Sequence, residues 1–309
     1  MSPLQFNFGN AVTHFRKTAG PRGFLIKFVA VFLLVQLGLQ GVGIFFNLPV
    51  YALYLEMFSN SVPPEELADR LSEASNKSGI VSLLVTPLSL LAWMAFEGCS
   101  QRRYMRGEGF RLRLGNDEWR LLVVGLLWLA IIFAIYIVFA LFVGIPLLIG
   151  AVMQSSSGML VAGIISGVMA LIGIVGVLYI VTRLSAAAAL TVRDEKIQFF
   201  ESWRLTKGRV GTLMGANFVL WIVSILGVMV FYGVMIGLVV WHFQPGFNGI
   251  LNIRALAAQP AFWVPVAGLC LVWLAFMALM QHVMGGPAAL VAKDDPNWIG
   301  NGGIARSFD

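Results

Sequence analysis

The stretch LLVVGLLWLAIIFAIYIVFALFVGIPLLIGAV, residues 121–152, decides the fold class of this chain. It contains no charged side chain, and it exceeds the roughly 20 apolar residues that an α-helix needs to cross a bilayer. Lipid offers no hydrogen-bond partners to the backbone, so a single apolar segment crosses the membrane as a helix. The stretch therefore predicts a membrane-spanning helix.

Five further segments have the same character, and they cover residues 24–46, 80–98, 159–190, 213–241 and 262–292. Hydrophobic residues make up 59% of the 309 residues and charged residues 12%, whereas soluble domains have about 45–50% and about 25%. This composition excludes soluble, disordered, collagen-like and disulfide-scaffold classes. We predict an all-α, polytopic membrane helix bundle with six transmembrane spans, forming one integral membrane domain over residues 1–309.

The distribution of basic residues predicts the orientation of the spans. Eighteen of the 21 lysines and arginines lie in the N-terminal arm and the start of the first span, in the loops after spans two and four, and in the C-terminal tail. The other three are Arg70, Lys77 and Arg254. Short cytoplasmic loops carry an excess of Lys and Arg, so both termini are expected to be cytoplasmic.

The connecting segments also show periodic patterns. Residues 109–115 alternate apolar and basic side chains, which predicts a strand, and Asn116 is the expected N-cap of the next helix. Residues 194–208 predict a cytoplasmic interfacial helix, with Trp203 at headgroup depth. On the other side of the membrane, residues 64–71 predict a short surface helix that begins with Pro64.

No group of residues predicts catalysis, a cofactor or a metal. The three histidines, His14, His242 and His282, lie in different regions, and there is no HExxH, Walker or G-x-S-x-G motif. Cys99 and Cys270 fall at different expected depths, so they are predicted to be unlinked. The chain is expected not to be an enzyme.

One candidate polar cluster comes from residues that share a cytoplasmic depth at the ends of descending spans. It contains Glu97, Arg183, Gln281 and His282, and it predicts a site for a headgroup or a partner. The alternative is that these side chains reach the interface separately.

A second set of candidates consists of basic and aromatic residues of the cytoplasmic loops that could contact lipid headgroups. Its members are Arg102, Arg103, Arg106, Trp203, Arg204, Lys207 and Arg209. Basic residues close to an anionic bilayer are attracted by about 1 kcal/mol each. Membrane lipids, including anionic ones, are therefore the expected partners, and nucleic acid is not.

Small residues recur at intervals of four in three spans. The glycine pairs are Gly163 and Gly167, Gly211 and Gly215, and Gly233 and Gly237. Such faces allow close helix contact, either within the chain or in a homo-oligomer or a complex with a membrane protein. Residues 188–195 and 288–295 also resemble each other, which is consistent with duplicated hairpins or with convergent helix ends.

The segment FESWRLTKG at 200–208, which follows AAAAL at 186–190, is similar to a pattern in bacterial six-helix membrane proteins. These are the YciC-like inner-membrane proteins and the membrane domain that precedes some glycerophosphodiester phosphodiesterases. LRLGNDEW at 112–119 resembles a loop of proteobacterial members. The resemblance implies a bacterial inner-membrane protein and carries over no catalytic residue.

Taken together, these patterns predict a non-catalytic integral membrane protein that acts through lipids or as a subunit or scaffold of a membrane complex. A transporter or channel for a small or amphipathic solute is the alternative, and an intramembrane enzyme is a weaker third option. The spans lack mid-membrane carboxylates of the kind that coupled transporters normally use.

Overall fold

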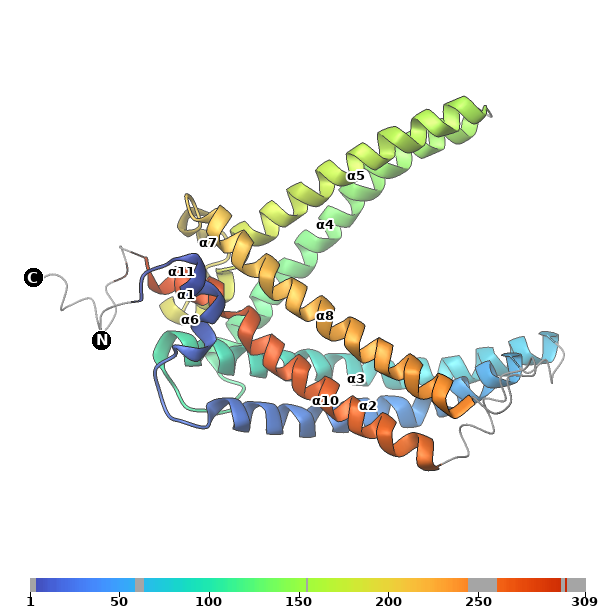
Figure 1. The fold of residues 1–309 in the computed structure, drawn as a ribbon, viewed down its shortest axis with the longest axis horizontal. Coiled ribbons are helices and arrows are strands. Elements are labelled where there is room, and N and C mark those ends of the chain that lie inside the picture. Colours follow the sequence, from blue (N-terminus) through green and yellow to red (C-terminus); the bar gives the residue numbers. More distant parts are fainter. Residues whose placement is uncertain (1–3, 59–63, 154, 244–259, 296–297, 299–309) are drawn as a thin grey trace, which may run out of the picture. The chain divides into compact units, whose positions relative to one another are not determined.

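A computed structural model describes residues 4–58, 64–153, 155–243, 260–295 and 298 of the chain. Throughout these residues the secondary structure is helical, with no strand (Figure 1). Six helices are long and apolar enough to cross a membrane, which confirms the predicted all-α polytopic bundle. They are α2 (Phe24–Phe58), α3 (Pro64–Arg106), α4 (Asn116–Val152), α5 (Ser156–Leu184), α8 (Val210–Phe243) and α10 (Pro260–Met284).

Short helices lie between and around these long ones. They are α1 (Phe8–Thr13) with a 3-10 turn at His14–Arg16, α6 (Ala187–Asp194), α7 (Glu201–Leu205) and α11 (Gly286–Lys293). The helix α6 follows α5 after a short break, and α11 follows α10 in the same way. The two segments that resemble each other in sequence thus overlap the two short helices that follow α5 and α10.

The chain divides into two compact units. Unit 1 comprises residues 1–20, 97–220 and 284–309, and unit 2 comprises residues 21–96 and 221–283. Unit 1 therefore holds the short helices, the α4–α5 hairpin and the ends of α3 and α8. Unit 2 holds α2, α10 and the remaining parts of α3 and α8. The prediction of one integral membrane domain stays a prediction.

Aromatic side chains pack the helices of unit 2. The ring of Phe28 lies edge-on to that of Phe96 at 5.3 Å, and Phe231 stacks on Trp273 at 4.7 Å. The ring of Phe276 lies directly over Gly227, where a methyl group would stand 2.3 Å from the ring. Any larger residue at this contact between α8 and α10 would therefore require the Phe276 ring to shift.

Within unit 1, α4 and α5 form an antiparallel hairpin (Figure 1). Ser166 of α5 donates a hydrogen bond to the carbonyl of Val143 at 2.9 Å. At the opposite end of the hairpin, the ring of Trp128 lies edge-on to that of Phe199, which precedes α7. The segment that leads into α7 is thus anchored to α4 by apolar contacts.

Three predictions about the connecting segments are wrong. Residues 107–114 run without helix or strand, because Arg113 pairs with acids and the Arg111 carbonyl accepts a hydrogen bond from the Arg102 side chain instead of from a neighbouring strand. The predicted helix at 194–208 is reduced to Glu201–Leu205, since Glu195 takes a left-handed conformation (φ 55°) that ends α6. The helix predicted at 64–71 does begin at Pro64, but it is not a short separate helix, because it continues without a break as α3.

Three smaller predictions have mixed outcomes. The N-cap of α4 is Gly115 rather than Asn116, because Glu118 accepts a hydrogen bond from the Gly115 backbone N–H at 2.9 Å. Cys99 and Cys270 are both free thiols, as expected from their positions. The glycine faces are largely open, since a methyl group at Gly163, Gly167, Gly211, Gly233 or Gly237 would meet no described atom within 4 Å.

Candidate functional site

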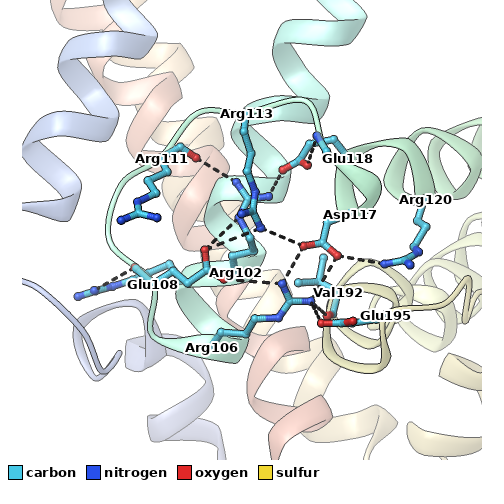
Figure 2. Close-up of polar contacts among 12 residues, drawn as sticks. Arg102, Arg106, Glu108, Arg111, Arg113, Asp117, Glu118, Arg120, Val192 and Glu195 are labelled. Atoms are coloured by element: carbon cyan, nitrogen blue, oxygen red, sulfur yellow. Dashed lines mark hydrogen bonds and ion pairs between the residues drawn. The ribbon is translucent and has the colours of Figure 1, made fainter.

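The densest polar region of unit 1 lies where the end of α3 meets the start of α4 (Figure 2). We call it the arginine network, and its side chains are Arg102, Arg106, Glu108, Arg113, Asp117, Glu118, Arg120 and Glu195. It forms because α3 ends in several arginines while α4 begins with two acids, which also suit the positive end of the α4 dipole. The short connection at 107–115 brings the arginines at the end of α3 next to the acids at the start of α4.

Arg102 lies at the buried centre of this network. Its side chain is 1% exposed, and it contacts the carboxylate of Glu118, which is fully buried. It also donates a hydrogen bond to the carbonyl of Arg111 at 3.0 Å and lies 3.5 Å from the Glu108 carboxylate. A buried charge pair of this kind is costly to break, because removing one partner leaves the other charge uncompensated.

Asp117 is shared by three arginines. Its carboxylate oxygens lie 2.8 Å from Arg106, 3.4 Å from Arg113 and 3.3 Å from Arg120 (Figure 2). The three partners come from α3, from the connecting segment and from α4 itself. A single carboxylate thus fixes the turn between two long helices.

Arginines also link the end of α3 to α6, and the end of α6 to α11. Arg106, at the end of α3, donates to the carbonyl of Val192 in α6 at 2.6 Å. Arg193 follows Val192 in the chain. It donates to the carbonyl of Ala292 in α11 at 2.7 Å and pairs with Asp295 at 3.1 Å. These carbonyls lie in the last turns of their helices, where they have no partner within the helix. The arginines therefore act as caps supplied by neighbouring segments.

A buried histidine lies on the other side of the α3 terminus. His14 is 2% exposed and stacks on Tyr104 at 5.3 Å. Neither ring nitrogen has a hydrogen-bond partner among the described residues. Burial, followed by the positive charges of Lys293 and Lys17, lowers the pKa of His14 from 6.5 to about 4. His14 is therefore neutral at physiological pH.

A different arrangement surrounds Arg183, near the end of α5. Its guanidinium lies 4.6 Å from the ring centre of Trp203 and 5.8 Å from that of Tyr179. The two rings are nearly perpendicular, with centres 5.8 Å apart. We call these three residues the Arg183 site. Arg183 is 5% exposed, and in the described part of the chain its side chain contacts these rings but no carboxylate.

The four residues of the predicted polar cluster divide between the two units. In unit 1, Glu97 accepts a hydrogen bond from Gln101 at 2.8 Å, and Arg183 forms the site described above. In unit 2, Gln281 donates to the carbonyl of Trp93 at 3.4 Å, and His282 packs against Phe24 at 5.2 Å. The joint cluster stays a prediction.

The predicted headgroup residues fall into an enclosed and an exposed group. Arg102 and Arg103 are buried, and Arg103 donates to the Thr18 hydroxyl at 3.2 Å. Arg106 belongs to the arginine network, and Arg209 pairs with Asp294 at 3.1 Å.

Trp203, Arg204 and Lys207 form the exposed group, on and just after α7. Headgroup binding by either group stays a prediction, but only the exposed group is open to solvent or lipid without rearrangement.

Sequence reasoning missed the arginine network and the burial of His14. The network has a signal in the sequence, because arginines at 102, 103 and 106 precede acids at 117 and 118 across a glycine-rich connection. His14 has no such signal, since its partner Tyr104 is distant in sequence. No grouping of His, Cys, Asp or Glu that could hold a metal ion occurs among the residues that the structure describes.

Comparisons with known proteins add no relative, since no family model, no curated protein and no solved structure matches this chain.

Proposed function

We propose that this chain is a non-catalytic, multi-pass protein of the bacterial inner membrane that acts through anionic lipids, directly or as a subunit of a membrane complex. The observation that carries the proposal is the contrast in exposure among the basic residues of unit 1. Arg102, Arg106 and Arg193 are neutralised by carboxylates and helix-end carbonyls. Only the small part of the basic residues that is exposed can therefore attract anionic lipid at the surface.

That part is the segment around α7, where apolar, aromatic and basic side chains alternate on an exposed surface. Phe200 is 70% exposed and Trp203 is 40% exposed, and Arg204 and Lys207 are exposed beside them. Aromatic side chains favour the headgroup level, and basic side chains favour anionic lipid there. Phe200, Trp203, Arg204 and Lys207, which we call the α7 strip, form a surface suited to the cytoplasmic face of a bilayer.

The proposal assigns no catalytic step because several acids of unit 1 that could act in catalysis already pair with arginines. Asp117 and Glu118 hold arginines, and Asp294 and Asp295 pair with Arg209 and Arg193. The resemblance to bacterial six-helix membrane proteins and the distribution of basic loops support the inner membrane as the location.

Tryptophan quenching by brominated lipid provides the test. The full-length chain is reconstituted into phosphatidylcholine bilayers that contain rising fractions of brominated phosphatidylglycerol. We expect an association constant for phosphatidylglycerol above that for phosphatidylcholine, which decreases as ionic strength rises. The double variant Arg204→Gln/Lys207→Gln is expected to reduce the difference between the two constants. Lys77→Gln removes one charge from the exposed Lys77–Glu73 pair and serves as the control. Equal constants for the wild-type protein at low salt would contradict the proposal.

A further inference from the structure

Arg183 differs from Arg102 and Arg193, two other enclosed arginines of unit 1, in having no carboxylate partner among the described residues. Arg102 contacts Glu118, and Arg193 lies 3.1 Å from Asp295. Around Arg183, the described residues supply two aromatic rings and no carboxylate, and its Nε is buried without a hydrogen bond. The described residues thus enclose the Arg183 guanidinium without placing a carboxylate beside it.

The aromatic contacts do not offset the cost of this burial. Taking a charged group out of water costs more than a desolvated cation–π contact returns. The guanidinium also has five N–H donors in a planar fork, which match the oxygens of a phosphate or carboxylate. An external anion with two oxygens would satisfy both the charge and the donors.

Hydrogen bonds hold the Arg183 site in a fixed position. The hydroxyl of Ser202 donates to the Arg183 carbonyl at 2.8 Å and accepts from the Ala186 backbone N–H at 3.1 Å. Thr206 donates to the same carbonyl at 3.1 Å. These bonds join α7 to the break between α5 and α6, so Trp203 and Arg183 are placed together before any ligand binds. A site arranged in advance loses less entropy on binding.

We propose that Arg183, Tyr179 and Trp203 bind one phosphate group of an anionic lipid headgroup. This inference rests on the proposed function and names a single position within it. Arg183 and its two rings lie near the expected cytoplasmic end of a span, where phosphates of lipid and aromatic belts meet. The Tyr179 hydroxyl and the Trp203 indole N–H have no hydrogen-bond partner among the described residues, so they remain available to the ligand. Free inorganic phosphate carries the same group, so the site could bind it as well as a lipid headgroup.

Native mass spectrometry of the full-length protein in mild detergent tests the site. Short-chain phosphatidylglycerol is titrated, and the dissociation constant of the first adduct is measured. A charge-assisted hydrogen bond contributes enough that Arg183→Gln is expected to weaken this adduct at least about tenfold. Arg183→Lys keeps the charge but not the planar fork of donors. Its dissociation constant is expected to lie between those of the wild type and Arg183→Gln. Lys77→Gln removes a charge from the exposed Lys77–Glu73 pair, outside the α7 strip and the Arg183 site, and it is expected to change the constant by less than about twofold.

A competition arm separates the two sources of phosphate. Displacement of phosphatidylglycerol by inorganic phosphate supports a site that recognises the phosphate group alone, whereas resistance supports one that requires the whole lipid. An unchanged first adduct in Arg183→Gln would overturn the inference. A carboxylate-bearing protein that copurifies with the wild-type chain and is lost from Arg183→Gln would also overturn it. If the inference fails while quenching still shows a preference for phosphatidylglycerol, the proposed function stands without this site.

Discussion

Arg102 and Arg183 are enclosed to a similar degree in unit 1, but the chain treats their charges differently. Arg102 contacts the buried Glu118 and the carbonyl of Arg111. Arg183 contacts the rings of Trp203 and Tyr179. A buried arginine with an internal carboxylate fixes the fold, whereas one that faces only aromatic rings is available to an anion from outside. The two regions therefore separate structural from functional basic residues.

The largest effect is expected where the internal pair is broken. Glu118→Gln leaves Arg102 buried without its carboxylate, which should lower the free energy of unfolding by about 3–5 kcal/mol. Denaturant unfolding of the full-length protein in detergent micelles measures this change. Glu108→Gln is the control, because Glu108 is partly exposed and shares Arg102 with Glu118. Equal losses for the two variants would show that Glu118 has no special role.

His14 predicts a pH dependence of nearly the same size. Its pKa is about 4 in the folded chain against an ordinary value of 6.5, so the unfolded chain binds the proton more readily. The contribution is present in full above about pH 6.5 and is lost as the pH falls to about 4, amounting to about 3 kcal/mol. His14→Phe keeps the ring on Tyr104 and should remove this part of the acid sensitivity. Identical pH profiles of unfolding for wild type and variant would contradict the assignment.

A smaller effect is expected at the junction that holds Arg183. Ser202→Ala removes a buried hydroxyl that both donates to the Arg183 carbonyl and accepts from the Ala186 N–H, which should cost about 1–3 kcal/mol. Thr206→Val should lower the free energy of unfolding by less, because Ser202 still donates a hydrogen bond to the Arg183 carbonyl. Thermal unfolding of both variants tests this order, and a larger loss for Thr206→Val would reverse the assignment of the main contact.

The smallest effect is expected at the surface. Arg204 pairs with Glu201 on the exposed side of α7, and such pairs contribute between about 0 and 1 kcal/mol. Arg204→Gln should therefore leave the unfolding temperature nearly unchanged while weakening the preference for phosphatidylglycerol. A marked loss of stability would place Arg204 among the structural arginines instead.

The sequence predicted the six spans because long apolar runs have one stable arrangement in lipid, and 121–152 required a helix before any contact was known. Predictions from the sequence were wrong in the connecting segments outside these apolar runs. The alternation at 109–115 is compatible with a strand, but side-chain pairing with Asp117 and Glu108 determines its path. The helix expected at 194–208 is interrupted because Glu195 takes a left-handed conformation, for which periodicity gives no signal.

The same difference applies to the candidate residues. The sequence identified Arg183 and Trp203 separately, as a residue at a helix end and as an interfacial aromatic. Their contact depends on the short connection after α6 and on the hydroxyls of Ser202 and Thr206, which bind a carbonyl about 20 residues earlier in the chain. Contacts of this kind follow from the folded path, so a single sequence does not contain them in a readable form.

The central claim is that the polar region of unit 1, including the α7 strip, faces the cytoplasmic side of the membrane. Lys207 is exposed just after α7, and the native Cys99 is buried, so Lys207→Cys provides a reporter. The variant, with Cys270→Ala, is treated in intact spheroplasts with a membrane-impermeant maleimide. We predict labelling of position 207 only after the membrane is permeabilised. Labelling in intact spheroplasts would contradict the orientation and with it the proposed contact between the α7 strip and the cytoplasmic leaflet.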